Sequence, residues 1–278
     1  LRIWVASSNY AEDLRIDYSI LDQHAESYRK IRNTFRYLLG NINDDFETIN
    51  LDKLDIDKLP ELEQLMLHKI YILNSNFKKY FNNYDFHNLY KELLNFCTVD
   101  LSAFYFDIRK DNLYCDPKDS EKRKSTILVL NIILNSLLKW FAPILSFTTE
   151  EIFKLLFKDQ KSVHLEKFLE FPDKFKNQKL SEKWSELIKI RNICNISIEE
   201  KRASKEIGSS LEADLKINLN QKLQNVINNI DFSELCITSK AEVSFTKDIE
   251  TTAITSKAKG TKCPVCWKIN EGPCPRHP

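Results

Sequence analysis

Glycine and proline are scarce in this sequence, with four glycines and eight prolines among 278 residues. This scarcity excludes a collagen-like chain and a linker-like chain, because both depend on these residues. The abundance of Leu, Lys, Glu and Ile instead predicts a mainly α-helical protein. With 42% hydrophobic and 29% charged residues, the chain can bury a substantial core.

A long hydrophobic run and an excess of one charge are also missing. The most apolar stretch, from Ile127 to Leu138, is interrupted by Asn131, Asn135 and Ser136 and is too short to cross a membrane. We therefore expect no membrane partner. The formal net charge is only +1, so any contact with nucleic acid has to be local.

The seven cysteines do not indicate disulfide bonds. Their number is odd, a CxxC pair is present, and no signal peptide is recognisable. These features predict a reducing compartment, taken here to be the cytoplasm, and metal binding by the clustered cysteines. Because the sequence starts at Leu1, inside a segment that resembles ordered structure, we expect it to be a fragment.

Apolar residues recur at helical spacing through the first 160 residues. Pro60 favours the first turn of a helix, and Asp85 is a candidate N-cap. Thr148 and Glu151 form the T-x-x-E pattern of a capping box. Five helices are expected, joined into a bundle over residues 19–160, at 19–42, 60–77, about 86–103, about 120–141 and 148–156.

The pattern changes after about residue 160. Ala213, Leu215, Ile217 and Leu219 alternate with polar residues, which indicates a half-buried strand. We expect a small α+β subdomain over residues 161–250, and a further strand leading into a metal-binding module over residues 251–278. The expected elements are helices at 181–195, 199–206 and 221–230, and strands at 213–219, 235–237 and 243–245.

Three cysteines and a histidine cluster near the end, as Cys263-Pro-Val-Cys266 and Cys274-Pro-Arg-His277. Each short turn places two donor atoms where one tetrahedral Zn²⁺ can bind both. A segment this short has no core of its own, so metal binding would supply much of its folding free energy. We predict one zinc ion per chain, in preference to chance cysteines in a disordered tail. His277 is the weakest ligand, because it lies one residue from the end and water could replace it.

The same tail is basic, and it contains one tryptophan. Trp267 follows the first turn, where an exposed indole could stack on an unpaired base; alternatively it packs under the turn as hydrophobic support. The basic residues of the tail are opposed only by Glu271, and the lysines among them could neutralise phosphates; they are Lys257, Lys259, Lys262, Lys268 and Arg276.

A second group of basic residues lies in the first predicted long helix. Arg29, Arg32 and Arg36 are spaced i, i+3 and i+7, with Asn33 beside them, so they share a stripe next to the apolar face. Three guanidinium groups on one rigid element suit phosphate or base-edge contacts. The alternative is a solvated face, or arginines paired with Asp and Glu on neighbouring helices.

Several stretches of the sequence resemble bacterial isoleucyl-tRNA synthetases. They are LRIWVASSNYAEDLRI (1–16), YRKIRNTFRYLLGN (28–41), FAPILSFTTEEIF (141–153), SVHLEKF (162–168), EIGSSLEADL (206–215) and KCPVCWK (262–268). Together they span nearly the whole chain in the order of that family. The related valyl and leucyl enzymes share the helical bundle but not IGSSLEA followed by a CPxCW turn.

The resemblance implies the C-terminal part of a class I synthetase that activates isoleucine with ATP and transfers it to tRNA(Ile). The HIGH and KMSKS motifs of catalysis are not in this sequence. ATP would therefore bind only the missing catalytic domain, and this fragment alone should be inactive. Residues 1–18 would end the stem-contact region that follows that domain. A monomer is expected.

In that family the helical bundle docks the anticodon stem, and a zinc-bearing C-terminal module helps to hold the anticodon loop. The resemblance therefore implies tRNA contacts at Arg29, Arg32, Asn33, Arg36, Trp267 and Lys268. Two features depart from the family: His277 stands where a fourth cysteine is usual, and the loop from Trp267 to Pro273 is shorter. Some members of the family have lost zinc.

Two other interpretations stay open from the sequence. The chain could be a free-standing zinc-knuckle module that binds RNA or protein, without an enzymatic partner domain. It could also be the equivalent part of a valyl- or leucyl-tRNA synthetase, although no long heptad arm of the valyl type is found.

Overall fold

A computed structural model describes residues 1–42, 46, 48–158, 161–247 and 250–277. The chain divides into two compact units. The first comprises Leu1–Arg109 and Pro117–Asn177, and the second comprises Lys110–Asp116 and Gln178–Pro278. The predicted division into four segments is not tested by this result and stays a prediction.

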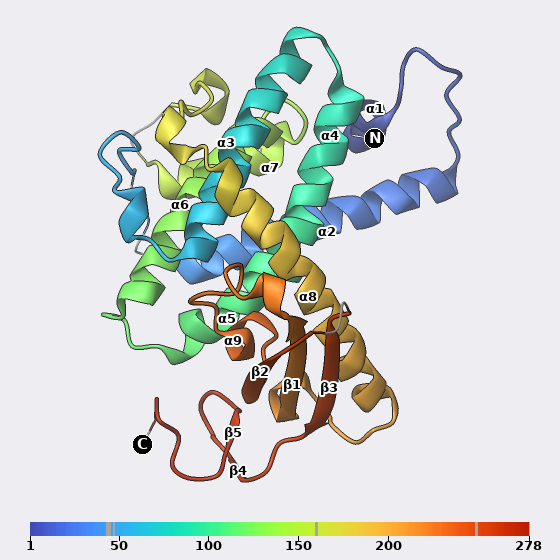
Figure 1. The fold of residues 1–278 in the computed structure, drawn as a ribbon. Coiled ribbons are helices and arrows are strands. Elements are labelled where there is room, and N and C mark those ends of the chain that lie inside the picture. The colour runs from blue at the N-terminus through green and yellow to red at the C-terminus, as the bar shows by residue number, and fades with distance from the viewer. Residues whose placement is uncertain (43–45, 47, 159–160, 248–249, 278) are drawn as a thin grey trace. The chain divides into compact units, whose positions relative to one another are not determined.

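The first unit is helical, as predicted (Figure 1). Its long helices are held together by the apolar faces expected from the sequence. The elements are α1 (Arg2–Ser7), α2 (Tyr18–Ile42), α3 (Glu61–Asn82), α4 (Phe86–Asn95), a π-helical segment (Phe96–Tyr105), the first part of α5 (Phe106–Cys115), α6 (Glu121–Phe141) and α7 (Ser146–Leu156), with short 3₁₀ turns at Ile56–Lys58, Val163–Leu165 and Asp173–Phe175.

Helix α6 forms the centre of this unit. Its C-terminal half, from Val129 to Phe141, is buried on every side, which explains why its sequence is almost continuously apolar. Aromatic edges close the core, because Phe77 meets the Trp140 ring at a centroid distance of 4.9 Å and Phe35 meets Phe141 at 5.9 Å. No helix in the part of the chain that the structure describes is long and apolar enough to span a membrane.

One buried ion pair lies in the first unit. The Arg109 guanidinium donates from Nε to Oε1 of Glu63 and from one terminal nitrogen to Oε2, each at 2.6 Å. Tyr105 and Thr126 donate their hydroxyls to the same Oε1, both at 3.1 Å. The side chains of Arg109 and Glu63 are 4% and 0% exposed, so this carboxylate depends entirely on these four hydrogen bonds.

The predicted cap at Asp85 and the predicted helix start near Ser120 are confirmed, whereas the capping box predicted at Thr148 is wrong. Asp85 accepts from the Asn88 N–H and Ser120 accepts from the Arg123 N–H, each satisfying a free donor of the first turn. Helix α7, however, starts at Ser146 without a side-chain cap. Thr148 lies inside α7, and its hydroxyl contacts the Tyr28 hydroxyl at 3.0 Å. The proposed capping box is therefore absent.

The third predicted helix was placed too short. It continues past Ala103 through the π-helical segment and α5 to Cys115, so the helical run is unbroken from Phe86. Its wider π turn rotates the following residues relative to the first part, so one helical period fails to describe both. The end of this extension contacts the metal centre described below.

The second unit is a small α+β structure, as predicted (Figure 1). Strand β1 (Ala213–Asn220) lies at the centre of a three-stranded sheet, parallel to β2 (Lys240–Thr246) and antiparallel to β3 (Thr252–Lys257). Its predicted alternation is confirmed, because Ala213, Leu215, Ile217 and Leu219 are all buried. The other elements are α8 (Gln178–Ala203), α9 (Phe232–Leu235), the short strands β4 (Thr261–Lys262) and β5 (Ile269–Asn270), and 3₁₀ turns at Ser210–Glu212 and Gln221–Leu223.

Three predictions for the second unit are wrong. The helices expected at 181–195 and 199–206 are one helix, α8, whose buried residues continue through Cys194 to Ile198. The helix expected at 221–230 is a 3₁₀ turn at its start, followed by turns. The strand expected at 235–237 is the end of α9, and Ile237 has a φ of +57°, which no strand allows.

Candidate metal centre and nucleic-acid interface

The first metal-binding turn is fixed by the backbone around it. The Trp267 N–H donates to the Cys263 carbonyl at 3.0 Å, and the Cys263 N–H donates to the Lys268 carbonyl at 2.9 Å. Strands β4 and β5 flank this loop. Gly260, just before β4, has a φ of +125°, and a Cβ there would lie 2.1 Å from the Asn270 carbonyl oxygen. Only glycine therefore allows the hairpin to close.

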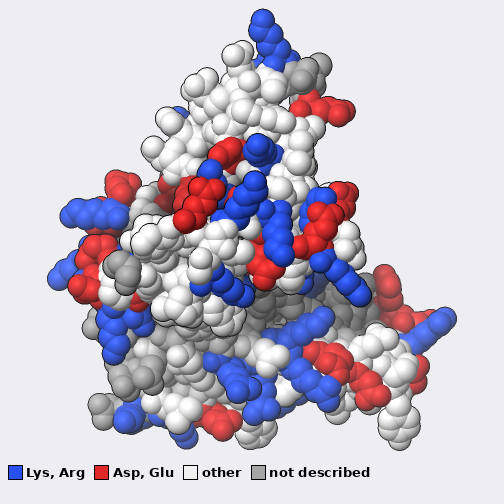
Figure 2. All heavy atoms as spheres, turned by 90° about the horizontal axis from the view of Figure 1, so that it is seen from below, with Lys and Arg blue, Asp and Glu red and all other residues white. Residues whose placement is uncertain are grey.

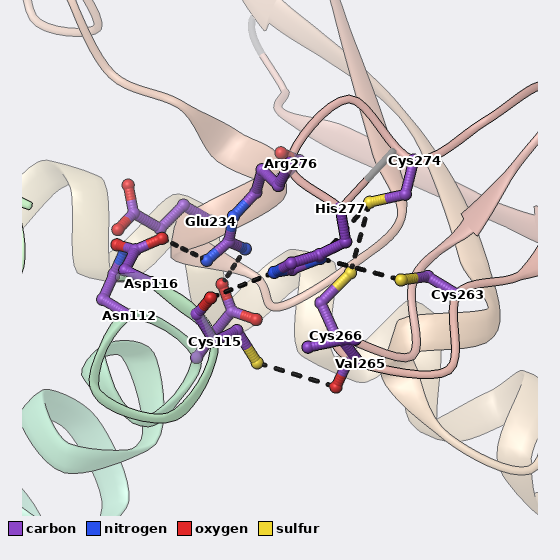
Figure 3. Close-up of polar contacts among 12 residues, drawn as sticks. Asn112, Cys115, Asp116, Glu234, Cys263, Val265, Cys266, Cys274, Arg276 and His277 are labelled. Carbon is purple, nitrogen blue, oxygen red and sulfur yellow. Dashed lines mark hydrogen bonds and ion pairs between the residues drawn. The ribbon is translucent and has the colours of Figure 1, made fainter. Parts of the chain in front are cut away.

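The second turn brings its two donors to the same point. The His277 N–H donates to the Cys274 carbonyl at 3.2 Å, which closes the CxxH segment. The donor atoms of Cys263, Cys266, Cys274 and His277 all lie within 4.8 Å of one another (Figure 3). The structure thus brings the four residues predicted from the sequence together in one cluster.

The spacing of these donors fits a tetrahedral ion. The Sγ atoms of Cys266 and Cys274 are 3.7 Å apart, and Nδ1 of His277 lies 3.7 Å from Sγ of Cys263 and 3.6 Å from Sγ of Cys274. A tetrahedral ion at roughly 2.0–2.3 Å from nitrogen and sulfur places its ligand atoms roughly 3.5–3.8 Å apart. The four residues can therefore hold one metal ion.

The histidine presents the correct nitrogen. Nε2 of His277 lies 3.0 Å from the backbone carbonyl of Cys115. A carbonyl only accepts hydrogen bonds, so Nε2 is the donor in this contact, and Nδ1 is the ring nitrogen that faces the sulfur atoms. Because a metal ion needs a free nitrogen lone pair, the tautomer with its proton on Nε2 is the one that binds.

Hydrogen bonds from backbone N–H groups lower the pKa of two of the three thiols. The Cys266 N–H donates to the Cys263 sulfur and is the main reason why the pKa of Cys263 is lowered to about 6. Desolvation raises the pKa of Cys274, but hydrogen bonds from the Arg276 N–H and from His277 outweigh it, so the net pKa is lowered. Burial raises the pKa of Cys266 to about 11. A bound cation would offset the free-energy cost of deprotonating this buried thiol, because cysteines bind metals as thiolates.

Sequence reasoning missed the C-terminal turn of α5, which completes this centre. Asp111, Cys115 and Asp116 contact the second turn, although they precede it by about 160 residues. No local pattern could have indicated this. Arg276, which was counted among the basic residues of the tail, is paired with Asp111 and Asp116. Its charge is therefore already partly neutralised.

Trp267 is exposed and conformationally unusual. The residue is 59% exposed and has a φ of +63°, a left-handed conformation that bulky residues rarely adopt. The Lys262 ammonium lies 5.6 Å from the centre of its ring. This exposure leaves the face of the indole accessible to an unpaired base. Lys268, which follows it, is half-buried.

The predicted arginine stripe is exposed along α2. Arg29, Arg32, Asn33 and Arg36 share this exposure. Arg29 pairs with Glu26 one turn earlier on the same helix. Among the residues that the structure describes, neither Arg32 nor Arg36 has an ion pair with a neighbouring helix. The stripe belongs to the first unit, whereas Trp267 and Lys268 belong to the second.

Charge of one sign does not cover the surface. On the face in Figure 2, Lys and Arg side chains are interspersed with Asp and Glu, in keeping with the formal net charge of +1. A polyanionic partner would therefore be held by particular side chains, not by a uniform positive field.

Comparison with known proteins shows to which family the chain belongs. The family described as "Anticodon-binding domain of tRNA ligase" matches residues 63–217, which is more than half of the chain. The chain belongs to this family. The match begins in α3 and ends in β1, so both the α2 stripe and the cysteine cluster lie outside it.

Similar proteins cover those remaining parts. The isoleucine–tRNA ligase of Pelagibacter ubique is 71% identical over 277 residues, which is all of this chain and 31% of that protein. The isoleucine–tRNA ligases of Bartonella henselae and Zymomonas mobilis are 37% and 39% identical, over 100% and 96% of this chain. The chain spans about 30% of the length of these relatives.

Proposed function

We propose that this chain is the part of an isoleucine–tRNA ligase that binds the anticodon region of tRNA(Ile). The observation that carries the proposal is the 71% identity to such a ligase over the full length of the chain. The longer protein would join isoleucine to its tRNA at the expense of ATP, in a reducing cytoplasm. This chain would contribute binding and orientation, which place the other end of the tRNA at the ligation site.

We further propose that the four-donor cluster binds one zinc ion. Three thiolates and one imidazole at tetrahedral spacing form a donor set that favours zinc over magnesium or calcium, which prefer oxygen ligands. Four protein ligands leave no open position for a reacting water molecule. The role of the ion is therefore structural: it would hold the two turns together.

The candidate RNA contacts are the α2 stripe and the residues after the first metal-binding turn. Arg32 and Arg36 are exposed on one rigid helix, which favours contacts with phosphates or base edges. Trp267 offers a flat aromatic surface for an unpaired base, and Lys268 a nearby charge. Asn33 and Arg29 extend the stripe. Anticodon loops expose unstacked bases that such groups recognise.

Binding measurements with the zinc-loaded chain test the proposed function. At moderate salt, tRNA(Ile) is expected to bind more tightly than a tRNA with a different anticodon, with affinity falling as salt rises because bound phosphates release counterions. Replacing Arg32 and Arg36 by Gln should weaken binding and reduce the salt slope by about 1 for each phosphate that the variant no longer binds. Equal affinity for both tRNAs would contradict the proposal.

Trp267→Gly separates a role in RNA binding from a role in the fold. Glycine accepts the positive φ of this position without strain. The variant should therefore keep the metal site and be as stable as the unmodified chain. If the indole stacks on a base, RNA affinity should fall by about 1–3 kcal/mol, or roughly 5- to 150-fold. Metal titration and tRNA binding are measured on the same variant. Unchanged RNA affinity with weaker metal binding would show that Trp267 supports the turn.

A further inference from the structure

The last turn of α5 lies against the second metal-binding turn, within the second unit (Figure 3). The contacts come from the side chains of Asp111 and Asp116 and from the backbone carbonyl of Cys115. None of these three residues belongs to the cluster of four metal donors. They instead contact the last donor, His277, and the residue just before it, Arg276.

Arg276 is held by two carboxylates at once. One terminal nitrogen donates to Oδ2 of Asp111 and the other to Oδ1 of Asp116, both at 2.5 Å. The side chains of Arg276, Asp111 and Asp116 are 30%, 19% and 15% exposed, so the pairing is largely shielded from water. Asn112 donates to the second oxygen of Asp116 at 2.8 Å and keeps that carboxylate in place. A planar guanidinium shared in this way has little freedom to rotate.

The Cys115 carbonyl acts on the neighbouring residue, His277. The last four carbonyls of a helix have no partner within the helix, and they carry the negative end of its dipole. The Cys115 carbonyl finds its partner in the Nε2–H of His277, at 3.0 Å. This bond selects the tautomer whose Nδ1 is free, and it makes that nitrogen a stronger donor to a metal ion.

We propose that residues 111–116 position His277 as the fourth metal ligand: the Cys115 carbonyl selects its tautomer, while Asp111 and Asp116 clamp Arg276 and so fix the backbone that carries the imidazole. This inference rests on the metal site proposed above. It assigns a function to a helix end far away in the sequence. It also ties the second turn to the end of α5.

The thiol of Cys115 has a different role from its carbonyl. Its Sγ lies 3.7 Å from the Val265 carbonyl and donates its proton toward that oxygen. The side chain therefore packs against the cluster as a neutral group, whereas the carbonyl makes the contact with His277. Cys115→Ala, which keeps the carbonyl, should leave the metal site intact.

Two variants break the clamp with opposite changes in charge. Asp111→Asn with Asp116→Asn removes two negative charges near the site, and Arg276→Gln removes a positive one. Simple attraction or repulsion of a cation would shift metal affinity in opposite directions in the two variants. The clamp instead predicts a loss of about 10- to 100-fold in both. Arg276→Lys keeps the charge without the two-pronged geometry and should show an intermediate loss.

Metal affinity is measured on the full chain by competition with a chromogenic chelator, and the ligand set is followed by the absorption of the cobalt(II) form. Asp119→Asn serves as the matched control, because this exposed carboxylate follows Asp116 closely in the chain and makes no ion pair with any residue that the structure describes. We expect Asp119→Asn and Cys115→Ala to match the unmodified chain, and both clamp variants to bind more weakly. Circular dichroism confirms that each variant keeps its helices.

The outcomes separate this inference from the metal site itself. If the unmodified chain binds no metal, the proposed site fails. If it binds one ion through three sulfurs and one nitrogen, but the clamp variants bind as tightly as Asp119→Asn, the site stands and the positioning role is wrong. A loss of one sulfur band in Cys115→Ala would make Cys115 a ligand and would also overturn the inference.

Discussion

Removing the metal ion is expected to unfold the segment from Thr261 to His277, including β4 and β5, while leaving the helices and the three-stranded sheet folded. Among residues 259–277, the buried side chains are those of Cys263, Cys266 and Cys274, so the interior of this module consists of the ligands themselves. Without an ion, nothing apolar remains to hold the two turns together.

The size of this effect follows from the chemistry of structural zinc. Binding to small zinc modules at neutral pH has an apparent free energy of about 10–16 kcal/mol, and this free energy drives folding. We expect Cys266→Ser or a strong chelator to abolish amide protection in residues 261–277. Protection of β1 and α8 should be retained, because their contacts do not involve the ion.

Hydrogen exchange measured by mass spectrometry, with and without chelator, follows both segments in one sample. The same chelator saturated with zinc beforehand is the control, since it should change nothing. Equal protection of residues 261–277 in the zinc-free and zinc-loaded chains would contradict this prediction. Loss of protection throughout the second unit would show that the ion supports the sheet as well.

Glu63→Ala is expected to destabilise the first unit by about 3–5 kcal/mol. The substitution removes the carboxylate that accepts two hydrogen bonds from the buried Arg109 guanidinium, and with it the acceptor of the Tyr105 and Thr126 hydroxyls. Removing one member of a buried ion pair costs far more free energy than the intact pair contributes relative to well-packed apolar residues. Replacing both Glu63 and Arg109 by Met should therefore recover most of the loss.

An exposed ion pair provides the matched comparison for that measurement. Lys78 pairs with Glu170 at 2.7 Å, but the two side chains are 39% and 85% exposed. Glu170→Ala should consequently cost at most about 1 kcal/mol. Urea unfolding followed by circular dichroism reports the helical unit. Similar midpoints for Glu63→Ala and Glu170→Ala would show that the buried network contributes little.

Local physics explains which parts of the fold could be predicted from the sequence. The cap at Asp85 depends on a residue three positions away, and the pattern of β1 depends on a period of two, so both are visible in a short window. Thr148 also fits a local pattern, that of a capping box, but the box does not form, because the Thr148 hydroxyl contacts the Tyr28 hydroxyl on another helix. Tertiary contacts override a local pattern of this strength.

Longer elements were predicted less well, because charged residues interrupted their apolar face. Helix α8 was split where exposed Glu199 and Glu200 dominate the sequence, although Ile198 keeps its buried face continuous. The short strand expected before β2 contains apolar residues that are buried in α9 and the turn after it. Burial alone does not distinguish a strand from one helical turn.

The metal centre could likewise be predicted from the sequence only in part. All four donors could be named from their spacing, because two short turns bring each pair together regardless of the rest of the fold. The clamp from Asp111 and Asp116 could not, since contacts across about 160 residues leave no periodic signal. For the same reason the sequence shows Arg276 only as one of the basic residues of the tail and gives no sign of its two carboxylate partners.

Mapping the footprint on tRNA(Ile) tests the central proposal most directly. The zinc-loaded chain is bound to the tRNA, and nuclease or chemical protection is read at every nucleotide. We predict that the chain protects the anticodon stem and loop and leaves the acceptor end accessible. This protection should be weaker in the Arg32→Gln/Arg36→Gln variant. Protection of the acceptor end with an accessible anticodon loop would contradict the account.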